Sequence, residues 1–310
     1  MRIVFFGSDD FAAVNLEHLL NSKQEIVAVV TSPDKPKGRG MKLSASPIKK
    51  LAETRSIPCL QPVSLKDEKV VKALQSYEAD IFVVVAYGRL LTQEILNIPK
   101  MLCLNVHGSL LPKYRGAAPV NWAILNGEKE TGVTIQKVAL ALDAGEIIVQ
   151  EKMKIEDDEH ADQLRARMAD VGANLLVKVL DGHGDGIFPL KLQDESQVSW
   201  APRLTKQMGR IDWTRKAQDI INQMRGLKPW PSAYTFYKGK MLKIMKAQIS
   251  QEDMKTGHPG EIVRVSKEAF MIACADKGLW ITHVQPEAGT AMAAAAFMSG
   301  HQVTLNFICE

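Results

Sequence analysis

A continuous run of apolar residues, Ile81-Phe82-Val83-Val84-Val85-Ala86, most constrains what this 310-residue chain can fold into. A strand that is apolar on both faces is typical of a parallel sheet covered by helices on each side. About the first two hundred residues alternate such strand-like runs with amphipathic helical stretches. This alternation predicts an α/β fold with a doubly wound, mostly parallel, Rossmann-like sheet, in which ligands bind beyond the carboxyl ends of the strands.

Local patterns place the individual elements of this first part. The run Ser8-Asp9-Asp10 supplies a helix N-cap, and Ser46-Pro47 opens a second helix with its proline in the first turn. The expected strands cover residues 2–6, 26–31, 81–86, 102–106 and 133–138. The expected helices cover residues 9–20, 46–52, 70–76 and 161–180.

The last third of the chain has a different pattern. A polar, loop-like stretch at 190–205 is interpreted as a linker between a domain at 1–189 and a second domain at 206–310. After a helix at 217–225, short alternating strands are expected at 232–237, 241–247, 260–265, 269–273 and 279–284. Such a series predicts a small C-terminal β-barrel of the oligonucleotide-binding (OB-like) type.

Several functional classes are disfavoured. The first β-α turn lacks the glycines of a dinucleotide fingerprint, and no phosphate-binding G-x-x-x-x-G-K-[ST] motif occurs. No apolar run reaches the roughly 20 residues of a membrane span. The four cysteines are scattered and six of the seven histidines are isolated, so we expect no metal site and a cytoplasmic protein without membrane association.

The net charge of +4 is unevenly distributed. Residues 206–310 carry a net charge of +5 and residues 1–205 a net charge of −1, while 34–50 contains six basic residues and one acidic residue. A basic loop and a basic second domain are suited to binding a polyanion. Ordinary solvated lysines would give the same counts, so charge alone does not decide.

Three polar residues form a candidate catalytic group. Asn105 and His107 end a predicted strand and, two residues apart, point to the same face. Asp143 follows the next predicted strand, 36 residues after His107. A carboxylate can orient an imidazole, and an amide N–H can stabilise an oxyanion, so this trio suits direct attack of an amine on a carbonyl group. A nucleophilic role fits Ser109 less well, because no Gly-x-Ser-x-Gly elbow surrounds it. It also fits Cys103 less well, because we expect that side chain to lie in the hydrophobic core.

The segment that begins at Asn105 carries a long signature. It reads Asn105-Val106-His107-Gly108-Ser109-Leu110-Leu111-Pro112-Lys113-Tyr114-Arg115-Gly116-Ala117-Ala118-Pro119 and resembles the signature of the tetrahydrofolate-dependent formyltransferases. Shorter matches lie at 33–40, 84–88, 131–134, 209–213 and 229–231. The resemblance covers residues 1 to about 290. Within the family, the chain most resembles the branch that acts on methionyl initiator tRNA.

The resemblance implies a formyltransferase that moves the formyl group of 10-formyltetrahydrofolate to the α-amino group of methionyl initiator tRNA, for translation initiation. Asn105 would stabilise the developing oxyanion, His107 would relay protons and polarise the formyl group, and Asp143 would orient His107 and help take the proton of the amine. The folate would lie against two segments. They contribute Ser109, Leu110, Leu111 and Pro112, and Val85, Tyr87, Gly88 and Leu91.

The resemblance also implies that the loop at 34–50 enters the acceptor-stem end of the tRNA. The residues expected to meet phosphate are Lys35, Lys37, Arg39 and Lys42, with Arg39 as the chief contact. The second domain would add a basic surface, and we expect a monomer. The chain lacks the lysine pair that usually follows the glycine at position 289 in the family.

Two other functions stay open. A formyltransferase for another amine, such as an amino sugar or a purine-pathway amine, would share the same three polar residues. The basic loop and the barrel-like second domain favour tRNA over these substrates. A folate- or RNA-binding module without turnover is disfavoured because all three polar residues are present.

Overall fold

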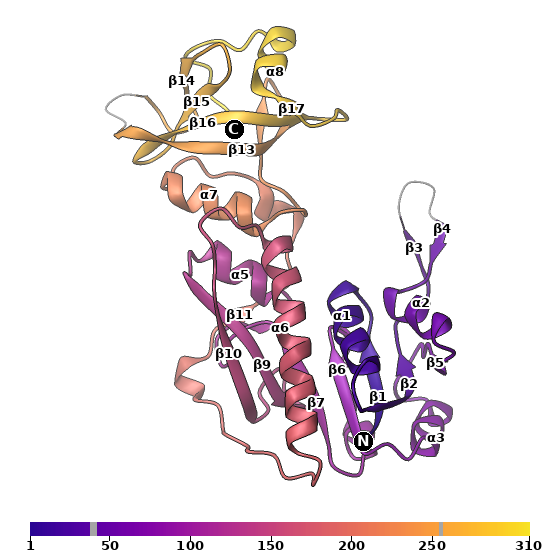
Figure 1. Cartoon of the computed structure of the whole chain (residues 1–310). Helices are drawn as coiled ribbons and strands as arrows, with labels where there is room; N and C mark the ends of the chain where they lie inside the picture. The colour runs from indigo at the N-terminus through magenta and orange to yellow at the C-terminus, as the bar shows by residue number, and fades with distance from the viewer. Residues whose placement is uncertain (38–41, 254–256) are drawn as a thin grey trace. The chain divides into compact units, whose positions relative to one another are not determined.

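The computed structural model describes residues 1–37, 42–253 and 257–310, which form two compact units (Figure 1). The first unit consists of Met1–Pro119, Glu130–Lys154 and Leu164–Pro202. The second consists of Val120–Lys129, Ile155–Gln163 and Arg203–Glu310. The chain therefore passes between the two units more than once.

A seven-stranded sheet, ordered β10-β9-β7-β6-β1-β2-β5, forms the centre of the first unit. Its strands are β1 (Arg2–Gly7), β2 (Glu25–Val30), β5 (Cys59–Leu60), β6 (Ile81–Val85), β7 (Leu102–His107), β9 (Glu130–Lys137) and β10 (Ile147–Lys154). The first five are parallel, whereas β9 pairs antiparallel with both β7 and β10. The prediction of a mostly parallel α/β sheet is confirmed, and β9 and β10 form an antiparallel edge next to β7.

The helices of this sheet begin where their capping residues predict. Asp9 accepts a hydrogen bond from the Ala12 N–H, and Ser46 caps its helix in the same way through the Lys49 N–H. The helices are α1 (Asp10–Leu20), α2 (Pro47–Thr54), α3 (Glu68–Ser76), α4 (Gln93–Leu96) and α6 (Ala161–Gly182), the last beginning in the second unit. Smaller elements are the hairpin of β3 (Lys35–Lys37) and β4 (Lys42–Ser44), the parallel pair of β8 (Arg115–Gly116) and β11 (Trp200–Ala201), and a 3-10 turn at Glu195–Gln197.

The two faces of the sheet are covered by different helices. On one face α6 lies so close that a Cβ on Gly172 would meet Val106 and Val133 of β7 and β9. The opposite face packs against α3 and α4, and Cys103 of β7 belongs to that core. Since side chains alternate along a strand, Asn105 and His107 share the face of Cys103, at the end of β7.

An antiparallel sheet ordered β12-β13-β16-β15-β14 forms the second unit, with β17 paired to β16. Its strands are β12 (Tyr234–Tyr237), β13 (Lys240–Asp253), β14 (Ile262–Val265), β15 (Phe270–Ala273), β16 (Lys277–Pro286) and β17 (Met292–Ala293). Its helices are α5 (Pro119–Leu125), α7 (Ala217–Gly226) and α8 (Ala294–His301), with a 3-10 turn at Lys206–Gly209. The predicted short strands are thus present.

The C-terminal residues join the two edges of this sheet. At one edge, the Ile262 N–H donates to the Phe307 carbonyl, and the Cys309 N–H donates to the Gly260 carbonyl. At the other edge, Phe236 and Glu310 exchange two backbone hydrogen bonds. Residues 306–310 therefore bridge β14 and β12 and give the sheet a barrel-like closure. The strand pattern predicted a barrel but not the part that these residues play in closing it.

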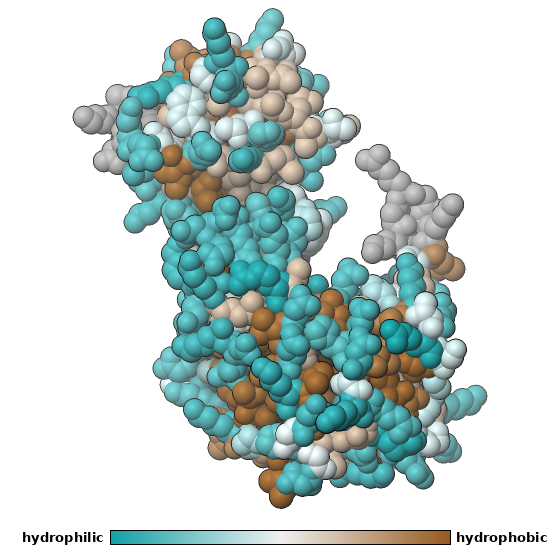
Figure 2. Space-filling model, viewed as in Figure 1, coloured by the Kyte–Doolittle hydropathy of each residue, from teal (hydrophilic) through white to brown (hydrophobic). Residues whose placement is uncertain are grey.

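The surface mixes polar and apolar residues. In Figure 2, apolar residues of the first unit are visible between the hydrophilic side chains that cover it.

Within residues 1–37, 42–253 and 257–310, none of the helices has the length and apolar character that a bilayer crossing demands.

Candidate active site

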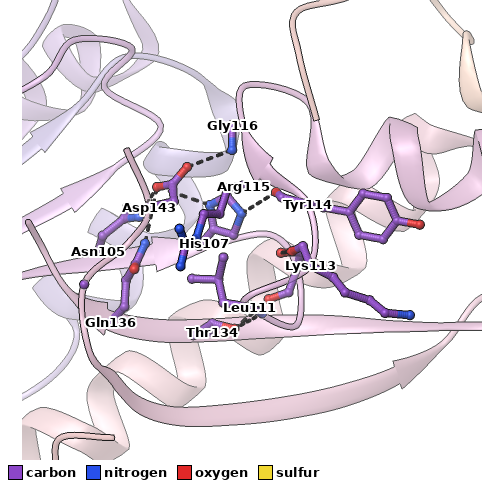
Figure 3. A network of polar contacts seen from close by, with 12 residues as sticks. Asn105, His107, Leu111, Lys113, Tyr114, Arg115, Gly116, Thr134, Gln136 and Asp143 are labelled. Carbon is purple, nitrogen blue, oxygen red and sulfur yellow. Dashed lines mark hydrogen bonds and ion pairs between the residues drawn. The ribbon is translucent and has the colours of Figure 1, made fainter. Parts of the chain in front are cut away.

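The candidate site is built on two adjacent strands. In the antiparallel pairing of β7 and β9, Asn105 lies opposite Gln136 and His107 lies opposite Thr134. Residues directly opposite each other share a face of the sheet. Four polar side chains therefore form a compact array at the carboxyl end of β7 (Figure 3).

The carboxylate of Asp143 is the centre of this array. Its Oδ1 accepts hydrogen bonds from Asn105 Nδ2 at 3.4 Å and Gln136 Nε2 at 3.3 Å, and its Oδ2 accepts one from the Gly116 N–H at 2.9 Å. His107 Nδ1 lies 3.6 Å from the same Oδ1. The structure thus brings together the three residues singled out from the sequence, although Asp143 comes from a separate loop.

The His107 ring is anchored through one of its two nitrogens. Its Nε2 lies 2.9 Å from the Tyr114 carbonyl oxygen, and the ring is only 6% exposed. A carbonyl oxygen only accepts hydrogen bonds, so Nε2 carries a hydrogen and donates it. This arrangement leaves Nδ1 as the nitrogen that faces Asp143.

The loop that carries Asp143 has an unusual backbone. Asp143 has a φ of +51°, in the left-handed region that aspartate tolerates better than most residues. Two residues later, a Cβ on Gly145 would lie 1.7 Å from the Lys137 carbonyl oxygen. Only glycine fits there, so the Asp143-Ala144-Gly145 sequence has a steric basis.

Gly116 is constrained in a similar way. Its φ is +124°, and a Cβ would lie 2.7 Å from the Ala201 carbonyl oxygen in the β8–β11 pair. This close approach directs the Gly116 N–H at Asp143. A conformation that suits glycine is therefore part of the site.

The segment from Ser109 to Lys113 is fastened to β9. Ser109 Oγ donates to the Lys113 carbonyl at 2.6 Å, and Thr134 Oγ1 donates to the Ser109 carbonyl at 2.6 Å. The Leu111 N–H donates to the same Thr134 hydroxyl at 3.1 Å. The serine hydroxyl is thus buried and used within the loop.

The predicted folate residues differ in what they present. In the first segment, Ser109 and Leu111 are buried, whereas Leu110 and Pro112 are half-buried. In the second, Gly88 is exposed with a φ of +79°. The apolar side chains of Leu110 and Pro112 and the backbone turn at Gly88 are therefore accessible to a ligand.

The remaining predicted folate residues point into the protein. Val85 is fully buried at the end of β6, and Leu91 and Tyr87 belong to the core. The ring of Tyr87 packs edge-on against Phe6, with centroids 5.5 Å apart. Burial raises the pKa of the Tyr87 phenol, against a smaller opposing effect of Arg89. Val85 and Tyr87 can therefore contribute only their backbone groups to a ligand.

The predicted tRNA loop corresponds to the β3–β4 hairpin. Lys35 is exposed in β3, while the backbones of Lys37 and Lys42 pair with each other across the hairpin. Arg39 lies outside the described residues. At the base of the hairpin, Asp34 accepts hydrogen bonds from Lys49 Nζ and Gln61 Nε2, both at 2.7 Å. The hydrogen bonds from Lys49 and then Gln61 hold the pKa of Asp34 below its ordinary value.

Sequence reasoning missed four residues of the site, three of them through polar side chains and one through its backbone N–H. Thr134 and Gln136 contact it from β9, Gly116 donates to Asp143, and Gln193 binds the Asp143 loop from the stretch interpreted as a linker. A signal for two of them exists in the sequence. Thr134 and Gln136 alternate with the apolar Val133 and Ile135 in β9, and buried polar side chains at such positions need partners.

Among the described residues, no group of three or more His, Cys, Asp or Glu side chains is arranged to hold a metal ion.

Comparison with known proteins decides the family. Residues 1–180 match the formyl transferase model, and residues 203–302 match the model of the formyl transferase C-terminal domain. The chain belongs to the formyl transferase family.

Relatives within this family match the chain almost from end to end. It is 44% identical over 305 residues to the methionyl-tRNA formyltransferase of Caldanaerobacter subterraneus subsp. tengcongensis, and the match covers 98% of each chain. It is 41% identical over 303 residues to the methionyl-tRNA formyltransferase of Geobacter sulfurreducens, covering 98% of this chain and 95% of the relative.

Solved structures share the fold at lower identity. The N-formyltransferase of Helicobacter canadensis, in complex with folinic acid and dTDP-3-aminofucose, aligns with a TM-score of 0.69 at 21% identity, covering 92% of this chain and 99% of the other. HypX of Aquifex aeolicus in complex with tetrahydrofolic acid aligns with a TM-score of 0.62 at 20% identity, covering 96% of this chain and 47% of the other. At these identities the likeness concerns the fold.

Proposed function

We propose that this chain transfers the formyl group of 10-formyltetrahydrofolate to the α-amino group of methionyl initiator tRNA, giving N-formylmethionyl-tRNA for translation initiation. The match along 98% of both chains to a methionyl-tRNA formyltransferase carries this proposal. The cluster of Asn105, His107 and Asp143 supplies the chemistry that such a transfer needs.

In this reaction the amine nitrogen forms a bond to the formyl carbon, and the bond from that carbon to the folate nitrogen breaks. The amine loses one proton and the folate nitrogen gains one. We assign Asp143 as the group that accepts the amine proton, because it is the carboxylate that lies beside Asn105 and His107 in this cluster. Its donors fix the carboxylate in one orientation before the substrates arrive.

Asn105 and His107 then take complementary roles. The Asn105 amide has two N–H groups and donates one of them to Asp143, which leaves the other for the negative charge that develops on the formyl oxygen. His107 is anchored through Nε2, so its Nδ1 is the nitrogen that exchanges a proton with Asp143.

Two segments at the sheet edge fit a folate. Leu110 and Pro112 offer half-buried apolar surface for a flat ring system, and the backbone turn at Gly88 offers polar groups for its edge. Val84 of β6 pairs with Asn105 of β7, so the turn that follows β6 starts next to the candidate site. Bound 10-formyltetrahydrofolate supplies the one-carbon unit there.

The tRNA is bound by basic residues outside this edge. The basic segment at 34–50 contributes Lys35, Lys37, Arg39 and Lys42, and the domain at 206–310, with its net charge of +5, contributes a second surface. We expect the chain to act as a monomer in the cytoplasm.

The test is incubation of the purified chain with 10-formyltetrahydrofolate and charged initiator tRNA, followed by mass spectrometry of the released amino acid. We expect N-formylmethionine. A dTDP-linked 3-amino sugar serves as the competing acceptor. Formylation of the amino sugar but not of the tRNA would assign the chain to another branch of the family.

A further inference from the structure

The side chain of Gln193 joins the Asp143 loop to the rest of the site. Its Nε2 donates to the Asp143 carbonyl oxygen at 2.8 Å and to the Gly145 carbonyl oxygen at 2.7 Å. A third oxygen, Gln136 Oε1, lies at 3.3 Å. An amide nitrogen has two hydrogens, so the two shorter contacts use both of them.

The other end of the same amide is held by a buried arginine. Arg115 donates to Gln193 Oε1 from Nε at 3.1 Å and from a terminal nitrogen at 2.9 Å. Arg115 is 4% exposed and also donates to Glu195. The arginine needs an oxygen acceptor and the two carbonyls need a nitrogen donor, so the orientation of the Gln193 amide is unambiguous.

The loop needs such a clamp. Asp143 has a left-handed backbone, and a non-glycine residue keeps this conformation only where its surroundings over-determine it. Gln193 binds the carbonyl of Asp143 itself and that of Gly145, which fixes the peptide that follows Asp143. The neighbouring Gly116 N–H fixes the carboxylate.

We infer that Gln193 is a positioning residue for formyl transfer. Through two backbone carbonyls it sets the orientation of Asp143 toward Asn105 and His107, without touching the reacting atoms. The inference rests on the proposed function. It also gives a role in the site to part of the stretch at 190–205.

The test compares two full-length variants with the same chemical change. Gln193→Met removes the hydrogen bonds and keeps the length of the side chain, while Gln197→Met changes an exposed glutamine of the same segment. We expect Q193M to lower kcat for formylation of methionyl initiator tRNA by about 10- to 100-fold, because small displacements of a catalytic group cost rates of this order. We expect KM for both substrates, and the kcat of Q197M, to stay within about 2-fold of wild type.

A double variant separates positioning from a general structural effect. If Gln193 acts through Asp143, then Q193M combined with Asp143→Asn will be no slower than Asp143→Asn alone, since residues that act as a unit are not additive. Losses that multiply in the double variant, or a wild-type kcat in Q193M, would overturn the inference.

A second variant guards against misfolding. Gln193→Asn keeps the amide but is too short to bridge both carbonyls, and we expect it to show the same loss of kcat and the same non-additivity. If neither variant folds, Gln193 is a folding residue and the inference is wrong. If the wild-type chain itself does not formylate the tRNA, the proposed function fails first, and the inference fails with it.

Discussion

His107 of β7 lies directly opposite Thr134 of β9, and the two side chains share one face of the sheet. The hydroxyl of Thr134 bonds the Ser109 carbonyl and the Leu111 N–H, while the His107 ring bonds the Tyr114 carbonyl. One cross-strand pair therefore fastens both ends of the loop from Ser109 to Tyr114. The site thus gains its rigidity from two neighbouring strands, one of them antiparallel to the other.

Asp143→Asn should abolish most of the activity with little loss of stability. The carboxylate accepts at both oxygens, and an amide would place a nitrogen donor against donors from Gly116 or from Asn105 and Gln136. We expect kcat to fall by at least about 100-fold, the usual scale for loss of a general acid–base group. Formylation assays quenched at successive times measure kcat. The midpoint temperature of thermal unfolding shows whether the variant is as stable as the wild type.

Glu146→Gln is the matched control for this variant. Glu146 lies in the same loop and pairs with Lys137 rather than with the polar array. A change in kcat of more than about 2-fold in E146Q, or a wild-type rate in D143N, would remove the role assigned to Asp143.

Gly145→Ala should damage both stability and activity. The added methyl group would lie 1.7 Å from the Lys137 carbonyl oxygen, so the loop that carries Asp143 must move. We expect a loss of about 1–3 kcal/mol in the free energy of unfolding, as for overpacking elsewhere. Urea unfolding measures it. Gly182→Ala is the control, because a Cβ there meets no atom within 4 Å, and that variant should be no less stable than wild type.

Arg39→Ala should weaken use of the tRNA without affecting the folate. A phosphate contact contributes counterion release, so we expect a several-fold higher KM for tRNA and a slope of log KM against log salt reduced by about 1. Fluorescence titration should give an unchanged folate affinity. Arg55→Ala removes an exposed arginine beyond the other end of α2 and should leave both quantities unchanged. Equal losses of tRNA use and folate binding in R39A would contradict the assignment.

Deletion of residues 306–310 should destabilise the second unit. These residues bridge β12 and β14 through backbone hydrogen bonds, and Cys309 is 3% exposed in the core. Each net hydrogen bond contributes about 0.5–1.5 kcal/mol, so we expect a loss of at least about 2 kcal/mol in urea unfolding followed by tryptophan fluorescence. Leu305→Ala, at a side chain that is 54% exposed, should change the transition little. An unshifted transition in the truncated chain would show that the barrel closes without its C-terminal residues.

The four cysteines should differ in their reactivity toward an alkylating reagent. Burial raises the pKa of the Cys103, Cys274 and Cys309 thiols to about 12, so at pH 8 to 9 they stay protonated in the folded chain. In the unfolded chain they ionise near 9, and rising pH above that value therefore favours unfolding. Cys59 is only half-buried, although its pKa is also raised, mainly by burial. Peptide mapping after brief labelling of the folded chain should find Cys59 modified first. All four cysteines should be modified at similar rates only when the chain is unfolded in denaturant.

Features that depend on short separations along the chain follow from local patterns of residues. The apolar run 81–86 predicted a doubly covered strand, and the two-residue spacing of Asn105 and His107 predicted that they share a face. Capping residues such as Asp9 and Ser46 predicted where helices begin. These patterns are readable because strand alternation and helix capping are set by residues within a few positions of one another.

The tertiary structure alone decided the partners that come from distant positions. Gln136 meets Asp143 because β9 runs antiparallel to β7, and Gln193 reaches the same loop from fifty residues further along the chain. The closure of the second sheet by residues 306–310 is of the same kind. Each of these contacts depends on the register or path of a segment that packs from far away, and no local pattern of residues specifies it.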